Sequence, residues 1–285
     1  MNLRQTRKKI KSVGNVKKIT KAMQMISAIK MKKAQNEAIE GRPYDAELKK
    51  LISKVMPRVS EKYSPLLSAK ENGLNKRLAI VVASNKGLCG GFNINLFRFV
   101  SKAVDFKETE LVIIGKKATY LGRLGGNVTA DFSSINPLNN ISAVFNFALE
   151  KFLNEGYREI VLFYNKFLSI LRVEPTMIRI LPVKVDLVEE ETEVETKPLD
   201  YLIEPSPAII IDPLLRSYVQ EAIKNAIIES EASEHSSRMI AMKNATDNAS
   251  DVITNLTMLR NKIRQQNITY ELLDMVSAKT SVEGN

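Results

Sequence analysis

The stretch PLLRSYVQEAIKNAIIESEASEHSSRMIAMKNATDNASDVITNLTMLRNKIRQQNITYELLDMVSA, from Pro213 to Ala278, decides the fold of this chain. It contains no glycine, and no proline after its first residue. At about 1.5 Å per residue, one continuous helix here would be about 100 Å long. Asp212-Pro213 is a start signal, because it combines a capping carboxylate with proline at the first helical position. We therefore predict a very long helix that begins at Pro213.

Two parts of this helix differ in polarity. The later part carries one narrow apolar stripe with steps of three and four, typical of a helix that packs along another helix. Its members are Ala241, Ala245, Ala249, Val252, Leu256, Leu259 and Ile263. The segment from Glu229 to Ser237 has almost nothing large to bury. It predicts a shaft surrounded by water or protein there, rather than a core helix.

A second long helix is predicted from Leu3 to about Met56, with a possible kink or break at Gly41-Arg42-Pro43. Its apolar stripe consists of Ile10, Val13, Val16, Ile19, Met23, Ile26 and Ile29. Two narrow stripes, one near each end of the chain, favour an antiparallel two-stranded coiled coil. In that pairing Ile19, Met23 and Ile26 are expected to face Val252, Leu256 and Leu259. The alternative is that each helix packs separately on the middle domain.

The periodicity changes from Asn75 onward. Continuous apolar runs, typical of strands buried on both faces, alternate with helical patterns. The runs are 78–83, 111–114 and 160–164, with a further strand at 176–183, and the helical patterns are 94–104, 117–124 and 141–153. This alternation predicts an α/β fold with a parallel, Rossmann-like layer. The predicted domains are a helix at 1–57, the inserted α/β domain at 75–207 and a helix at 212–280.

Composition bounds the class of protein. The 285 residues are 44% apolar, which suffices for a core, and a single cysteine, Cys89, leaves no internal disulfide. The sequence has no apolar stretch long enough to span a bilayer and no apolar block of a signal peptide. We therefore expect a cytosolic chain.

The net charge of +10 is concentrated near the N-terminus, where the first 36 residues hold 11 Lys and Arg and no acid. Such a segment can contact nucleic acid, anionic lipid or an acidic protein surface. It has no aromatic residue for base stacking before Tyr44. Contact with acidic protein loops therefore fits at least as well as nucleic-acid binding.

Few residues suggest catalysis. The glycine-rich turn from Ser84 to Asn93 follows the first strand, but matches neither the dinucleotide fingerprint nor a phosphate loop. We interpret it as a tight turn that lets strand and helix approach closely. His235 is the only histidine, which excludes a histidine-based triad or metal cluster, and Cys89 is expected to be a buried small residue. No catalytic residue, cofactor site or metal site is predicted.

Four segments resemble the gamma subunit of F-type ATP synthases, in the same order and across the whole chain. They are KKITKAMQMI (17–26), GLCGGFN (87–93), MIAMKNATDNA (239–249) and ITYELLDMVSA (268–278). The resemblance implies a bacterial-type rotor subunit that couples proton flow through the membrane sector to ATP synthesis or hydrolysis, and that is not itself catalytic. The alternative hypothesis is a nucleotide-binding enzyme built on the Rossmann-like domain.

The resemblance also implies partners. These are the alpha and beta subunits around the paired helices, and the epsilon subunit and c-ring beside the inserted domain, on the cytoplasmic face of the bacterial plasma membrane. No nucleic acid is expected. Tyr201 and Glu204 are expected at the c-ring and epsilon end. The coupling surface is expected to include Lys17, Lys18, Lys21, Met23, Arg260, Lys262, Arg264 and Glu271, with Met23 beside the moving acidic loops of the beta subunits.

Overall fold

The computed structural model describes residues 2–59, 63–68, 74–183 and 203–283. The chain divides into two compact units. The paired-helix unit contains Met1–Ser27 and Arg238–Asn285, and the sheet unit contains Ala28–Ser237. Helices α1 (Leu3–Val55) and α5 (Pro207–Glu283) contribute to both units. The three predicted domains follow the order of elements along the sequence, whereas these two units are defined by compactness in space. The predicted domain division therefore stays a prediction.

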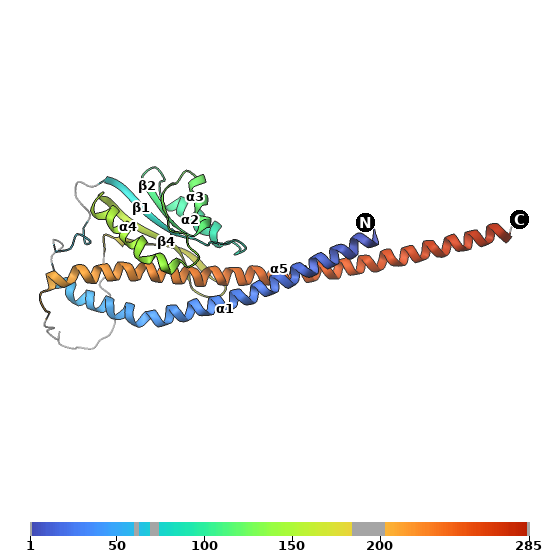
Figure 1. Ribbon diagram of the computed structural model, residues 1–285, viewed down its shortest axis with the longest axis horizontal. Helices are drawn as coiled ribbons and strands as arrows, with labels where there is room; N and C mark the ends of the chain where they lie inside the picture. The colour runs from blue at the N-terminus through green and yellow to red at the C-terminus, as the bar shows by residue number, and fades with distance from the viewer. Residues whose placement is uncertain (1, 60–62, 69–73, 184–202, 284–285) are drawn as a thin grey trace. The chain divides into compact units, whose positions relative to one another are not determined.

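The sheet unit is built on a five-stranded sheet in the order β3-β2-β1-β4-β5 (Figure 1). The strands are β1 (Leu74–Val82), β2 (Thr109–Ile114), β3 (Asn127–Asp131), β4 (Tyr157–Phe167) and β5 (Val173–Leu181). All neighbouring pairs are parallel except β4 and β5. The predicted Rossmann-like layer is therefore confirmed, with an antiparallel strand at one edge.

Helices cover both faces of this sheet (Figure 1). They are α2 (Phe92–Ala103), α3 (Tyr120–Arg123) and α4 (Ile141–Leu153), with short 3-10 turns η1 (Met56–Arg58), η3 (Lys116–Thr119) and η4 (Pro137–Asn140). One face packs against α2 and α3. The other packs against α4 and the parts of α1 and α5 that belong to the sheet unit.

The first part of α5 is a core helix. Five large aliphatic residues recur at steps of four, and each is at most 1% exposed: Ile211, Leu215, Val219, Ile223 and Ile227. Burying one such side chain contributes about 1.5–3 kcal/mol. This row holds α5 against the sheet together with Leu48, Ile52 and Val55 of α1, which belong to the same cluster.

Gly115 marks a close backbone approach at the end of β2. Its φ of 101° lies in the left-handed region, and a Cβ added there would lie 2.0 Å from the carbonyl oxygen of Ala83. Only glycine fits between these neighbouring strands. The backbone is then carried into η3, whose Lys117 N–H donates to the Ser84 carbonyl at 3.0 Å.

Two predictions about helix ends are corrected. Helix α5 begins at Pro207, six residues before the predicted start at Pro213. Asp212 does not cap it, because its carboxylate accepts from the Ser64 hydroxyl at 2.8 Å and the Arg216 guanidinium at 2.6 Å. Helix α1 runs from Leu3 to Val55 without a break at Pro43.

The prediction that the serine-rich part of α5 is not a core helix is wrong. Ser230, Ser233 and Ser236 are at most 2% exposed. Their hydroxyls donate to the carbonyl oxygens of Val82, Asn165 and Ile170, at 3.5, 3.0 and 2.5 Å. Small hydroxylated side chains let the helix lie close to the sheet while each donor finds an acceptor.

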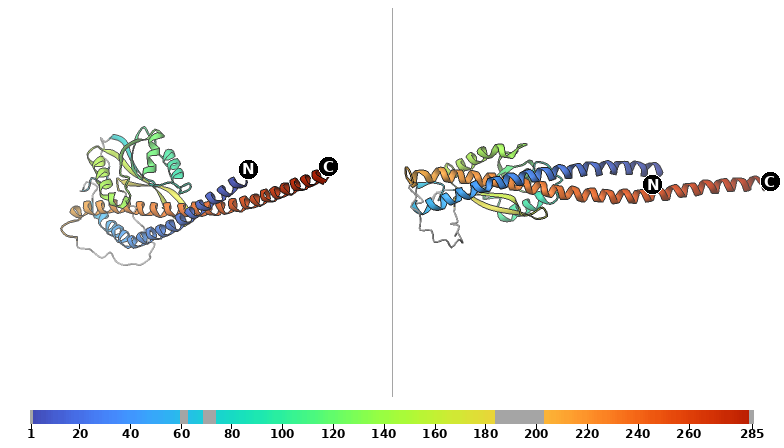
Figure 2. Two further views of the ribbon diagram at one scale, coloured as in Figure 1. Left: turned by 45° about the vertical axis from the view of Figure 1, so that its right-hand side comes forward. Right: turned by 90° about the horizontal axis from the view of Figure 1, so that it is seen from below.

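In the paired-helix unit α1 and α5 run side by side in opposite directions (Figure 2). The predicted antiparallel coiled coil of the two terminal helices is confirmed. The Thr246 hydroxyl donates to the Thr20 hydroxyl at 2.8 Å and thereby marks the register of the pair. Because the two helices are antiparallel, this register places Leu256 opposite Ile10 and not opposite Ile19, Met23 or Ile26.

Candidate functional site

The two helices of the paired-helix unit meet along a seam whose buried side chains are mostly small or polar. Its buried members are Thr6, Thr20 and Ser27 on α1, and Arg238, Met242, Thr246 and Ala249 on α5. Large aliphatic residues normally occupy such positions in stable coiled coils. A seam of this kind brings the backbones close but contributes little apolar burial.

The predicted stripe on α1 lies largely on the wrong face. Val16, Ile19 and Ile26 are 49%, 59% and 55% exposed. On α5, Val252 and Leu259 are 44% and 38% exposed, so the predicted facing of the two stripes is wrong as well. An exposed apolar stripe on a helix that already has a partner indicates a surface that another protein covers.

Basic side chains of the predicted coupling surface all lie in the paired-helix unit. Lys18, Lys21, Lys262 and Arg264 are exposed, and Lys17 and Arg260 are half-buried. Two of them donate hydrogen bonds to uncharged side chains: Lys21 to Gln24 at 3.4 Å and Arg260 to Asn261 at 3.2 Å. Within the described part of this unit none of the six forms an ion pair. Their charges are therefore available to an acidic partner.

The structure brings only some predicted coupling residues together. Met23 is half-buried and lies within two turns of Lys17, Lys18 and Lys21 on α1. By the Thr20–Thr246 register, Arg260 lies beside the first turn of α1. Glu271 lies on the end of α5, beyond the residues that pair with α1.

This end of α5 is exposed in the part of the chain that the structure describes. From Arg264 to Ser277 every side chain is exposed. The large apolar ones are Ile268, Tyr270, Leu272, Leu273, Met275 and Val276, with exposed fractions between 48% and 65%. An isolated helical end with this many apolar residues needs surrounding protein.

Of the two residues predicted for the c-ring and epsilon end, Glu204 belongs to the sheet unit. Glu204 is exposed and lies just before α5 begins. Tyr201 lies outside the described residues. The structure therefore does not bring Glu204 together with the coupling residues in one unit.

The strand order of the sheet identifies the place at which Rossmann-like proteins bind ligands. In such folds ligands bind beyond the carboxyl ends of the strands where the strand order reverses, here between β1 and β4. In this chain α5 lies across that place, with Ser230 bonded to β1 and Ser233 bonded to β4. The chain's own helix therefore fills the usual nucleotide position.

The glycine-rich turn lies at the carboxyl end of β1. Leu88 and Gly90 adopt left-handed φ values of 63° and 58°. The Asn93 side chain accepts from the Ser84 N–H at 3.1 Å and donates to the Ser84 hydroxyl at 2.8 Å, which locks the turn onto the end of β1. Cys89 is 2% exposed, as predicted. The polar groups of the turn are thus used within the protein.

A buried carboxylate of α5 faces the sheet at this edge. One carboxylate oxygen of Glu229 is buried and has no hydrogen-bond partner among the described residues. Burial raises the pKa of Glu229, and the Lys166 charge, the Tyr164 hydroxyl and Arg42 offset this only in part. Burial and the Glu229 carboxylate in turn raise the pKa of Tyr164. The ionised form of Glu229 is therefore disfavoured in the folded protein.

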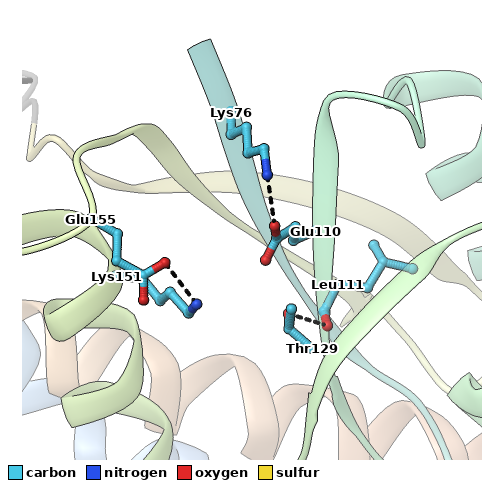
Figure 3. Close-up of polar contacts among 6 residues, drawn as sticks. All are labelled: Lys76, Glu110, Leu111, Thr129, Lys151 and Glu155. Atoms are coloured by element: carbon cyan, nitrogen blue, oxygen red, sulfur yellow. Dashed lines mark hydrogen bonds and ion pairs between the residues drawn. The ribbon is translucent and has the colours of Figure 1, made fainter. Parts of the chain in front are cut away.

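A second set of charges lies near the amino-terminal ends of β1 and β2 (Figure 3). The Lys76 ammonium donates to the Glu110 carboxylate at 3.2 Å, and Lys151 pairs with Glu155 at 2.8 Å. Burial alone would raise the pKa of Glu110, but the Tyr157 hydroxyl and the charges of Lys76 and Lys151 together lower it. Glu110 thus joins β2 to Lys76 of β1 and Tyr157 of β4, while Lys151 and Glu155 pair at the end of α4, so we assign these groups a structural role.

Searches of the described residues bound the chemistry further. In that part of the chain no three His, Cys, Asp or Glu side chains are grouped so that they could hold a metal ion. Nor is any described helix both long and apolar enough to cross a membrane.

Comparison with known proteins decides the family. A family model described as ATP synthase matches residues 2–282. The ATP synthase gamma chain of Pelotomaculum thermopropionicum is 35% identical over 99% of both chains. This chain belongs to the ATP synthase gamma-chain family. Other members are similarly close: the gamma chain of Akkermansia muciniphila is 35% identical over 99% of both chains, and that of Methylacidiphilum infernorum is 37% identical over 97% of both.

Solved structures share the gamma-chain fold. A chain of the Euglena gracilis mitochondrial ATP synthase superimposes with a TM-score of 0.69 at 19% identity, covering 99% of this chain and 95% of that one. A chain from the central stalk and c-ring of the Tetrahymena thermophila enzyme gives 0.59 at 24% identity, covering 80% and 99%. Both support the arrangement of a Rossmann-like layer with two long terminal helices.

Proposed function

We propose that this gamma chain is the central-stalk rotor of an F-type ATP synthase. It couples proton flow through the membrane sector to ATP synthesis or hydrolysis in the catalytic head by rotating. Membership of the family along residues 2–282 supports this function. The chain contributes no catalytic residue of its own.

The proposed partners follow the two units. Alpha and beta subunits surround the paired-helix unit, while the epsilon subunit and the c-ring contact the sheet unit at Tyr201 and Glu204. The chain is then a peripheral protein on the cytoplasmic face of the bacterial plasma membrane.

One observation carries the proposal beyond family membership, namely the exposed end of α5. Apolar side chains from Ile268 to Val276 are about half exposed or more. Removing them from water is favourable by about 25 cal/mol per Å² of apolar surface, which a surrounding socket of other subunits provides. Deep packing would lock a rotor, but exposed side chains can slide against a smooth apolar wall.

The charges around Met23 suit a contact that is made and broken repeatedly. An exposed ion pair contributes only about 0–1 kcal/mol, so Lys18 and Lys21 can exchange one acidic partner for the next at little cost. We assign Lys17, Lys18, Lys21, Met23, Arg260, Lys262, Arg264 and Glu271 to this coupling surface.

The alternative of a nucleotide-binding enzyme has no supporting observation. Ser230 and Ser233 of α5 lie where the nucleotide would bind. In the glycine-rich turn, Ser84 and Asn93 form hydrogen bonds with each other.

The test is Met23→Lys in the assembled complex. A cation added beside Lys17, Lys18 and Lys21 adds an attraction to acidic loops that rotation must break at every step. Proton pumping per ATP hydrolysed, measured in membrane vesicles, should fall while assembly stays intact. Met23→Leu is the matched control and should keep the wild-type ratio. An unchanged ratio with normal synthesis in Met23→Lys would remove this site from the coupling surface.

A further inference from the structure

A groove on the outer face of the sheet unit remains unexplained by the rotor function. It lies between α2 and the η3–α3 segment and has a volume of about 520 Å³. We call it the α2–α3 groove and define it by Ile94, Phe97, Arg98, Lys117, Tyr120 and Leu124. Its volume falls within the range of about 300–1,000 Å³ typical of small-molecule sites.

The groove is lined by aromatic and aliphatic side chains. The rings of Phe97 and Tyr120 stack with centroids 6.0 Å apart and an interplanar angle of 26°. Ile94 and Leu124 are 61% and 44% exposed, and Tyr120 is 50% exposed. Apolar surface that is concave and still open to water favours a ligand with an apolar body.

The charged residues that line the groove are both basic. The two segments that form it, residues 83–104 and 115–130, contain six basic residues and no Asp or Glu: Lys86, Arg98, Lys102, Lys116, Lys117 and Arg123. Arg98 and Lys117 line the groove from opposite walls. Within the described part of the chain neither forms an ion pair. The groove is therefore complementary to an anion.

We propose that the α2–α3 groove binds a soluble single-chain anionic amphiphile of the fatty-acid type. The acyl chain lies on the Phe97–Tyr120 stack, and the carboxylate lies between Arg98 and Lys117. A concave site accepts one narrow chain, whereas a flat bilayer surface cannot reach its floor. The combination of an apolar body with a single anionic head also fits better than a nucleotide, whose several phosphates would need more than two lining cations.

Calorimetric titration of the full-length chain with sodium laurate below its micelle concentration tests the proposal. One saturable site is expected. Decanoate should bind about 15-fold more weakly, since each buried methylene contributes about fourfold. Dodecyltrimethylammonium should bind at least fivefold more weakly than laurate, because Arg98 and Lys117 repel its head. Equal affinity for laurate and dodecyltrimethylammonium would overturn the proposal.

Variants distinguish laurate binding in the groove from nonspecific binding elsewhere on the surface. Arg98→Gln and Lys117→Gln should each weaken laurate binding about three- to fivefold, as expected for an exposed ion pair. Arg123→Gln, a basic residue outside the lining, is the charge control and should bind like wild type. Tyr120→Asp should abolish binding, and Ile135→Asp, at a fully exposed apolar residue outside the groove, should not. Equal losses in the Arg98 and Arg123 variants would contradict the assignment.

Photolabelling gives a second measurement that does not depend on the stability of the variants. A diazirine-bearing laurate irradiated with the wild-type chain should label peptides from residues 92–103 and 116–124. Labelling confined to other peptides would overturn the proposal. So would binding to phosphatidylglycerol vesicles without any binding of monomeric laurate, because the surface would then be a membrane contact.

Discussion

Helix α5 has two regions that share a backbone conformation but not a source of stability. In the sheet unit it buries a row of large aliphatic residues, among them Ile223 and Ile227, which are fully buried. In the paired-helix unit it meets α1 through small or polar residues such as Thr246 and Ala249, and its larger side chains, such as Val252, remain exposed. The first region is stabilised by its own chain. The second leaves large apolar side chains exposed.

The largest expected effect is in the sheet unit. Ile223→Ala leaves a cavity in the core and should lower the free energy of unfolding by about 2–5 kcal/mol. Ile19→Ala, at a residue 59% exposed in the paired-helix unit, should change it by less than about 0.5 kcal/mol. Urea unfolding of the full chain, followed by circular dichroism, measures both. Similar losses in the two variants would contradict the comparison.

A smaller effect is expected where α5 changes from large to small buried residues. Asn165 pairs with Pro175, which has no N–H to donate, and the Ser233 hydroxyl donates to the Asn165 carbonyl instead. Ser233→Ala should therefore cost about 1–3 kcal/mol in the same urea assay.

Thr254→Ala is the matched control for this loss. Thr254 is exposed and its hydroxyl donates only within its own helix, to the Ser250 carbonyl. Its removal should cost less than about 0.5 kcal/mol. If the Ser233 variant were as stable as this control, the serine contacts would not hold α5 on the sheet.

The smallest expected effect has the opposite sign and depends on pH. Because the pKa of Glu229 is raised in the folded protein, the ionised carboxylate destabilises the fold above that pKa. Glu229→Gln should raise the melting temperature at pH 7–8 by about 2–4 °C, which corresponds to about 1 kcal/mol for a domain of this size. The gain should shrink as the pH falls and disappear below 4.5, the ordinary pKa of glutamate, because wild-type Glu229 is then protonated in both the folded and the unfolded state.

The exposed Glu47 provides the control for this experiment. Its side chain is 71% exposed, so Glu47→Gln should leave the melting temperature nearly unchanged across the same pH range. A Glu229→Gln variant that is less stable than wild type at pH 7 would show that the buried charge stabilises the fold.

Much of the fold could be predicted from the sequence, because strands buried on both faces are continuous apolar runs such as 111–114. The residue range of strand β3 was not predicted, since only Val128 and Ala130 are apolar in this edge strand. The serine-rich part of α5 was misjudged because burial was equated with large side chains. Ser233 is fully buried because its single hydroxyl finds a carbonyl and its small size allows close approach.

The candidate site was predicted less well than the fold. Steps of three and four on α1 fit two stripes, one through Ile19 and Ile26 and one through Thr20 and Ser27. Hydrophobicity favoured the first for the helix pair, but the partner helix meets the second. Periodicity shows that a face is covered and does not show by which protein. The basic α2–α3 groove was missed because the net charge of the chain outside the N-terminal segment is near zero. This sum does not reveal the excess of Lys and Arg in the two segments that form the groove.

Rotation within the assembled complex tests the central claim most directly. Lys107 is exposed in the sheet unit, so a biotinylated Lys107→Cys can carry a bead, while native Cys89 is buried and does not compete for the label. With the catalytic head fixed to a surface, the account predicts that the bead turns in one direction while ATP is hydrolysed. Steady ATP hydrolysis beside a bead that does not turn would contradict it.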